Sequence, residues 1–139
     1  MIPILTVHEL GIQLAASEKP LVQSSSLTLQ AGKTLAIVGE SGSGKSLTAL
    51  ALMQLLGPQF TTSGDVTFDG KQLQGHSAYD KTKPDMQSIG GNDMAMIFQE
   101  PMTALNPLHT IGRQISEAIT IHQPAPSNAG AQVKSLLEQ

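Results

Sequence analysis

Cysteine and tryptophan are absent from this sequence of 139 residues, and aromatic residues make up only 3% of it. Without cysteine the chain has no disulfides and no thiolate metal sites, which fits a reducing compartment. With so few aromatic rings, the core has to be aliphatic, built from leucine, isoleucine, valine, methionine and alanine. The length is sufficient for one domain with such a core.

A long apolar run and a basic stretch are also missing. No segment approaches the roughly 20 apolar residues that a membrane span requires, and the start of the chain, Met1-Ile2-Pro3, does not resemble a signal peptide. The net charge is −3, so nucleic-acid binding is not indicated. We therefore expect a soluble protein, cytoplasmic or peripheral to a membrane protein.

The strongest motif present is Gly39-Glu40-Ser41-Gly42-Ser43-Gly44-Lys45-Ser46, which follows the phosphate-loop pattern G-x-x-x-x-G-K-S. Its glycines let backbone N–H groups turn towards a polyphosphate without side chains in the way. A chance match in a chain of this size has a probability of about half a percent. The motif therefore predicts a nucleotide phosphate site.

Each type of residue in this loop suits one part of a magnesium nucleotide. Lys45 can reach the β- and γ-phosphates as a compact positive charge, and the Ser46 hydroxyl can hold Mg²⁺. A helix that begins here adds its N-terminal N–H groups and dipole. Thr48 either contacts the α-phosphate or is an ordinary first-turn threonine. The candidate nucleotide contacts are Gly39, Glu40, Ser41, Gly42, Ser43, Gly44, Lys45, Ser46, Leu47 and Thr48.

The segments on both sides of the loop support this interpretation. Residues 34–38 are a short apolar run of the kind found in a buried parallel strand. Residues 46–56 are apolar on nearly every side, which predicts a helix buried between layers. The pair Gly57-Pro58 is a helix stop signal.

Residues 4–14 alternate between apolar and polar side chains and predict one strand, bent at Gly11. A turn over 15–20 leads to a second strand at 26–29, antiparallel to the first. With the strand at 34–38, these two segments predict a mixed sheet. Residues 64–68 and 71–73 then predict a small hairpin around Asp69-Gly70.

The second half of the chain predicts less regular structure. Residues 74–91 read as a loop with one helical turn near 86–89, in which His76 and Tyr79 are solvated loop residues. Residues 94–98 predict another core strand. A helix capped by Thr110 should run to about His122, and Ser127 should cap a final helix whose apolar residues are Val133, Leu136 and Leu137.

A second long motif follows at the end of that expected strand. It reads Met94-Ala95-Met96-Ile97-Phe98-Gln99-Glu100-Pro101-Met102-Thr103-Ala104-Leu105-Asn106-Pro107. Together with the phosphate loop, it resembles the ATPase subunits of ATP-binding-cassette (ABC) importers for peptides, oligopeptides, glutathione and nickel. The similarity extends over nearly the whole chain.

This resemblance implies roles for particular residues. Gln99 matches the Q-loop glutamine, which binds Mg²⁺ and lies near the attacking water. The candidate catalytic residues are therefore Lys45 and Gln99, the candidate metal ligands are Ser46 and Gln99, and the cofactors are ATP and Mg²⁺. The alternative for Gln99 is a strand-end glutamine bonded to backbone.

The implied fold class is α/β: a P-loop NTPase core with a mixed sheet, an antiparallel β subdomain and the start of a helical subdomain. The ATP-binding core and β subdomain would occupy about 1–98, and the Q-loop with the start of the helical subdomain about 99–139. The implied partners are transmembrane permease subunits, a second ATPase subunit in a homodimer or heterodimer and, indirectly, a substrate-binding protein. The location would be peripheral, on the cytoplasmic side of the inner membrane.

Two departures from the family pattern qualify these expectations. Leu14 occupies the position of the aromatic residue that usually stacks on adenine, so the grip on the base should be weaker by about 1 kcal/mol. The signature motif, the second Mg²⁺-binding aspartate, the catalytic glutamate and the switch histidine do not occur in these 139 residues. We therefore expect this chain alone to bind nucleotide without turnover.

Two other classes of protein compete with this interpretation. One is a truncated, non-catalytic fragment that binds nucleotide weakly or misfolds. The other is a small nucleotide kinase, which would need arginines over the phosphates. Lys71, Lys81, Lys83 and Arg113 do not form a convincing set of this kind.

Overall fold

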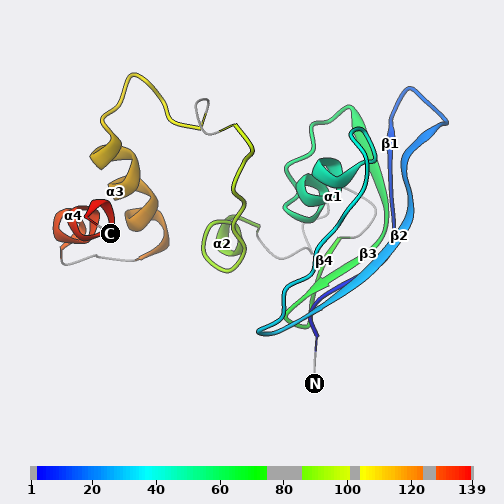
Figure 1. The fold of residues 1–139 in the computed structure, drawn as a ribbon, viewed down its shortest axis with the longest axis horizontal. Helices are drawn as coiled ribbons and strands as arrows, with labels where there is room; N and C mark the ends of the chain where they lie inside the picture. The colour runs from blue at the N-terminus through cyan, green and yellow to red at the C-terminus, as the bar shows by residue number, and fades with distance from the viewer. Residues whose placement is uncertain (1–2, 75–85, 101–103, 124–127, 139) are drawn as a thin grey trace. The chain divides into compact units, whose positions relative to one another are not determined.

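The computed structural model describes residues 3–74, 86–100, 104–123 and 128–138 (Figure 1). The chain divides into two compact units, residues 1–86 and 87–139. The first unit contains the sheet and the phosphate loop, and the second contains the Q-loop segment and the helices that flank it. The expected loop residues His76 and Tyr79 and the expected cap Ser127 lie outside the described residues.

The first unit is built on a four-stranded sheet with the order β2-β1-β3-β4, in which every pairing is antiparallel. Its strands are β1 (Pro3–Leu14), β2 (Pro20–Gln30), β3 (Phe60–Phe68) and β4 (Lys71–Gln74). The expected strand at 4–14 is confirmed as β1, and the second strand is longer than the predicted 26–29. β1 lies in the interior of the sheet, so both of its edges are hydrogen-bonded.

The core of this unit lies on one face of β1. Leu5, Val7, Leu10 and Ile12 are buried, and Val66 of β3 is buried beside them. The alternation shifts between Val7 and Leu10 because a bulge interrupts the pairing there. The backbone of β1 departs from extended geometry at Glu9, which has φ 51°. This residue lies two positions before Gly11, where the sequence predicts the bend.

Two glycines permit the turns of this sheet. Gly64 lies across from the bulge with φ 86°, and a Cβ there would be 2.4 Å from the Glu9 carbonyl oxygen. Asp69 and Gly70 have φ values of 46° and 72°, so both central residues of the β3–β4 turn are left-handed, as in a type I′ turn. The hairpin predicted around Asp69-Gly70 is therefore confirmed.

The phosphate-loop helix α1 (Lys45–Leu52) packs on the sheet but is shorter and less buried than predicted. It ends at Leu52 rather than Leu56 because Gln54 adopts the left-handed conformation, with φ 54°. Of its side chains, only Thr48 and Ala51 are buried. The prediction of a helix buried on every side was therefore wrong, since α1 is covered on the sheet side alone.

The two strands expected at residues 34–38 and 94–98 are not formed. Val38 is 88% exposed and Ile97 is 98% exposed. A strand is stable only when its backbone groups pair with a neighbour, and no strand of the described part of the chain pairs with either segment. The described sheet is accordingly antiparallel and not mixed.

The second unit contains α2 (Met86–Ile89), α3 (Ile111–His122) and α4 (Ala129–Leu137). The single turn at 86–89 and the helix capped by Thr110 are confirmed. Val133 of α4 is buried against α3, whereas Leu136 and Leu137 are exposed. Asn128 is the N-cap of α4. None of the helices described is long and apolar enough to cross a membrane.

The cap of α3 gives a test of this helical unit. The Thr110 hydroxyl accepts a hydrogen bond from the Arg113 backbone N–H at 3.3 Å, whereas the Thr120 hydroxyl donates to the Ser116 carbonyl at 2.8 Å. We expect Thr110→Ala to destabilise α3 by about 1 kcal/mol. Thr120→Ala should stabilise it by a few tenths of a kcal/mol, since alanine is the better helix former. Amide hydrogen exchange of α3 measures both, and equal effects of the two changes would contradict the assigned cap.

Candidate phosphate-binding site

The loop at 39–46 wraps around the ammonium group of its own lysine. Lys45 Nζ donates hydrogen bonds to the Gly39 carbonyl at 2.7 Å and the Glu40 carbonyl at 2.6 Å, and it lies 3.3 Å from Ser43 Oγ. Two of its three donors therefore hold the loop closed. The third makes the longest contact and is the one that a phosphate oxygen can most easily replace.

The glycines of the loop are required by its geometry. Gly42 and Gly44 have φ values of 82° and 91°, a region that residues with a Cβ rarely adopt. A Cβ on Gly39 would lie 2.6 Å from Ser43 Oγ, and one on Gly44 would lie 2.5 Å from Val22 Cγ2. Gly44 thus lets the loop approach β2 closely, a contact that the motif alone does not reveal.

The N-terminus of α1 faces this loop without a side-chain cap. Gly44 is the N-cap residue, no side chain accepts from the first turn, and the turn contains no acidic residue. The free N–H groups and the positive end of the helix dipole therefore remain available to an anion. This arrangement agrees with the prediction that the loop opens a helix.

Thr48 makes a local bond in this helix. Its side chain is buried, and its hydroxyl donates to the Gly44 carbonyl at 3.0 Å, beside the backbone N–H of the same residue at 2.8 Å. A contact with a phosphate would require this hydroxyl to leave its partner. In this structure the Thr48 hydroxyl therefore serves a local bond at the start of α1.

The two candidate metal ligands belong to different units. Ser46 is exposed at the start of α1, and Gln99 is exposed in the segment after residues 94–98. The described residues contain no group of three or more histidine, aspartate or glutamate side chains that could hold a metal ion. A magnesium ion at Ser46 would consequently take most of its ligands from phosphate oxygens and few from the protein.

Two leucines at one end of the sheet are exposed near the loop. Leu14 ends β1 and is 37% exposed, and Leu21 follows the start of β2 and is 41% exposed. A Cβ on Gly44 would lie 3.4 Å from the Leu21 carbonyl oxygen, so β2 reaches the loop at this residue. The sequence analysis missed Leu21, although two adjacent apolar residues in a strand, Leu21 and Val22, imply that one faces outward.

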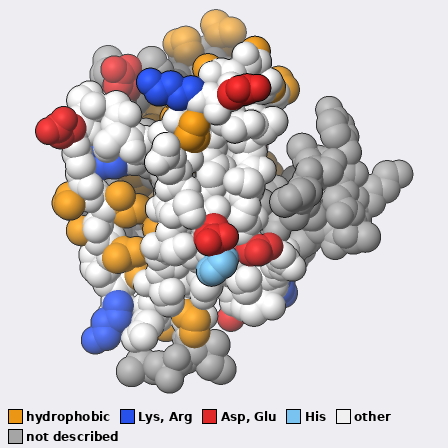
Figure 2. Space-filling model, turned by 90° about the vertical axis from the view of Figure 1, so that its right-hand side faces the viewer, with side chains coloured by type: hydrophobic (Ala, Val, Ile, Leu, Met, Phe, Trp, Pro, Cys, Tyr) orange, Lys and Arg blue, Asp and Glu red, His pale blue; other side chains and the backbone are white. Residues whose placement is uncertain are grey.

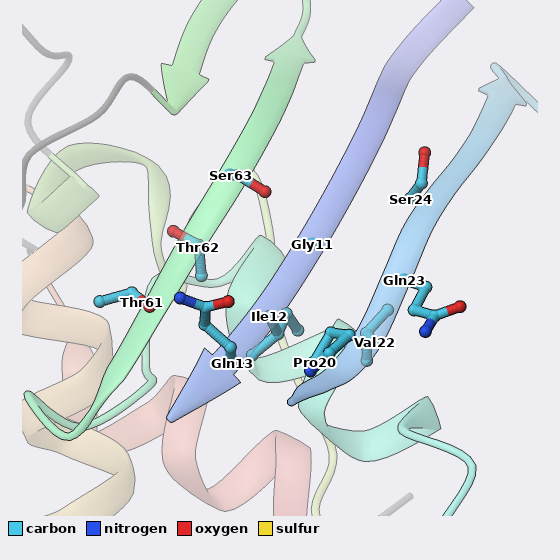
Figure 3. A pocket seen from close by; sticks show the side chains of 10 residues that line it. All are labelled: Gly11, Ile12, Gln13, Pro20, Val22, Gln23, Ser24, Thr61, Thr62 and Ser63. Atoms are coloured by element: carbon cyan, nitrogen blue, oxygen red, sulfur yellow. The ribbon is translucent and has the colours of Figure 1, made fainter. Parts of the chain in front are cut away.

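A hollow of about 450 Å³ lies on β1, β2 and β3 (Figure 3). Gly11 leaves space in it, and the lining includes Gln13, Gln23, Thr61 and Ser63. Gln13, Thr61 and Ser63 are exposed residues that alternate with the buried face. The buried residues Ile12 and Val22 also line the hollow, and no residue of the phosphate loop does. The view in Figure 2 shows acidic and basic side chains scattered over a mostly uncharged surface.

The close approach of Gly44 to β2 can be tested against Gly42. Both have positive φ, but a Cβ on Gly42 would have no atom within 4 Å. We expect Gly42→Ala to lower the free energy of unfolding by about 1 kcal/mol from backbone strain alone. Gly44→Ala should lower it by about 1–3 kcal/mol more, because it also forces the loop away from Val22. Denaturant unfolding measures the difference, and equal losses would show that the loop does not pack on β2.

Comparison with known proteins supports the resemblance found in the sequence. The sequence profile of the ABC transporter family matches residues 22–139. The glutathione import ATP-binding protein GsiA of Escherichia coli (strain K12) is 45% identical over 144 residues, which cover 98% of this chain and 23% of that protein. The proteins of the same name from Shigella boydii serotype 4 (strain Sb227) and Shigella flexneri are 45% and 44% identical over the same shares.

The chain thus spans about a quarter of the length of these relatives, and the match includes both the phosphate loop and the segment around Gln99. The chain belongs to the ABC transporter family.

Proposed function

We propose that residues 39–48 bind the phosphates of ATP and that the chain is the N-terminal part of the ATPase subunit of an ABC importer. The single observation that carries this proposal is the closed loop around Lys45. Its ammonium donates to the Gly39 and Glu40 carbonyls, and its third N–H makes only the longer contact with Ser43 Oγ. The uncapped N-terminus of α1 supplies additional N–H groups for the same anion.

Magnesium fits the same site as a bridge to the phosphates. The exposed hydroxyl of Ser46 would provide one oxygen ligand, and the amide oxygen of Gln99 would provide another. An amide oxygen is neutral, so it can bind and release a hard cation without a change in charge. Mg²⁺ would supply the charge neutralisation that phosphoryl transfer requires.

The base of the nucleotide would contact aliphatic side chains. Leu14 and Leu21 are both partly exposed, and Leu21 adjoins Gly44. Leucine offers apolar contact without the stacking of an aromatic ring, so affinity would depend mainly on the phosphates. We therefore expect weak discrimination between ATP and GTP.

The complete importer subunit would hydrolyse ATP in a dimer of ATPase subunits and couple this to permease subunits on the cytoplasmic side of the membrane. Its solutes would be peptides or related compounds, and a substrate-binding protein would deliver them. The name of the relatives, which concerns glutathione import, supports this class of solute. Measurement of ATP-dependent uptake by cells that express the whole subunit with its permease tests this part.

A second candidate is nucleotide binding without turnover by these 139 residues. The exposure of residues 34–38 favours it, because the segment that enters the loop has no strand partner in the described part of the chain. Electrostatic positioning provides most of the rate of phosphoryl transfer, and a loop whose entering segment is unpaired lacks part of the support that such positioning needs. ATP binding with no release of inorganic phosphate would support this candidate over an active ATPase.

Replacement of Lys45 tests the phosphate site. We expect Lys45→Ala to weaken ATP binding by about 10–100-fold, the loss of one or two hydrogen bonds to a charged group. Lys33→Ala is the matched control, since Lys33 is exposed in the turn before the loop and lies outside the phosphate-loop motif. Titration calorimetry with MgATP measures both affinities, and equal affinities of the two variants would refute the proposed site.

Thr48→Val decides between the two roles of this residue. Valine has the same shape and no hydroxyl, and the Gly44 carbonyl keeps the backbone N–H of residue 48 as a partner. We expect ATP affinity to stay within about twofold of the wild type, as for a hydroxyl that makes a local bond. A tenfold loss with unchanged thermal stability would instead place the hydroxyl on the α-phosphate.

A further inference from the structure

At the C-terminal end of α1 a glutamine, Gln54, occupies the left-handed position, where glycine is the usual residue. The Gln54 N–H donates to the Ala51 carbonyl at 3.0 Å, and the Leu55 N–H donates to the Leu50 carbonyl at 2.8 Å. These two bonds form a Schellman motif, whose left-handed residue is Gln54 with φ 54°. A residue with a side chain is strained in the left-handed conformation, so another interaction of Gln54 must offset that strain.

The side chain of Gln54 makes this interaction with β4. Its Nε2 donates to the Leu73 carbonyl at 2.5 Å, across 19 residues of sequence. In the β3–β4 ladder, Val66 pairs with Gln74 and Thr67 pairs with Gln72, so Leu73 is the extra residue of a bulge. A bulged residue has no partner in the ladder, and the side chain of Leu73 is buried. The Gln54 amide therefore ties the chain just after α1 to the bulged residue of β4.

The other end of α1 touches the opposite edge of the sheet. Gly44, the N-cap residue, lies against Val22 of β2. Because β2 and β4 are the two edge strands, the contacts of Gly44 and Gln54, on either side of α1 (Figure 1), lie at opposite edges of the sheet. Between these ends only Thr48 and Ala51 are buried, so the two end contacts account for much of what holds the helix in place.

We propose that Gln54 is a positioning residue for the phosphate loop: its hydrogen bond to the bulged Leu73 carbonyl fixes the far end of α1 and thereby the direction of its N-terminus. A rigid helix transmits a rotation at one end to the other. Loss of the bond would let α1 pivot about the Gly44 contact and would misdirect the N–H groups that face the phosphates. The inference extends the proposed ATP site to a residue outside the loop.

Two variants separate the hydrogen bond from the backbone strain. Gln54→Glu keeps the side-chain length and the strain but replaces the amide donor by a carboxylate that cannot donate. Gln54→Gly removes the bond and also relieves the strain. Gln30→Glu, at the exposed end of β2, introduces the same charge on the same sheet and is the control.

The first measurement uses the protein without nucleotide. We expect both Gln54 variants to increase amide exchange in the last turn of α1 and in β4 by about fivefold, the effect of one lost hydrogen bond. The amide resonances of Gly42 and Gly44 should shift in both variants and not in Gln30→Glu. The thermal midpoint of Gln54→Gly should exceed that of Gln54→Glu. Exchange and loop resonances like those of the wild type would overturn the proposal.

The second measurement is the affinity for MgATP, which should fall by about three- to fivefold in both Gln54 variants. Faster amide exchange in α1 and β4 with unchanged loop resonances and unchanged MgATP affinity would show that the Gln54 hydrogen bond is only structural. This result would reject the positioning role. If the wild-type protein does not bind ATP, the proposed function fails independently. The exchange and resonance measurements then still decide whether Gln54 directs the loop.

Discussion

The approach of the Gly44 backbone to Val22 is the constraint on which the site depends. It brings the end of the phosphate loop and the first turn of α1 onto β2, at a distance that admits no Cβ. The sheet can offer this contact because β1 holds β2 on one side and β3 on the other. The glycines alone would allow the same turn in another protein, but the contact with Val22 fixes the orientation of the turn relative to the sheet.

Lys45 links this constraint to the chemistry of the family. Its ammonium bonds to the carbonyls of its own loop, so a positive charge is held in place beside the uncapped N-terminus of α1. Such preorganisation lowers the reorganisation needed when an anion binds. Membership of the ABC transporter family supports the proposal that this arrangement binds ATP.

The exposed segments at 34–38 and 94–98 show the opposite case. Their composition is that of buried strands, yet Val38 and Ile97 are almost fully exposed. Apolar composition creates the tendency to be buried, but a parallel strand also needs neighbours for its backbone groups. No neighbour exists among the described residues, and therefore these two predictions failed while the self-paired hairpin at Asp69-Gly70 formed as expected.

The sequence by itself determined the features that depend on local geometry. The glycines of the loop, the turn at Asp69-Gly70 and the cap at Thr110 follow from which residues tolerate a given backbone conformation or bond to a nearby N–H. Only the tertiary structure decided the contacts of Gly44 with Val22 and of Gln54 with Leu73. Both join residues about 20 positions apart, and no local pattern encodes which backbone atom a folded sheet leaves within reach.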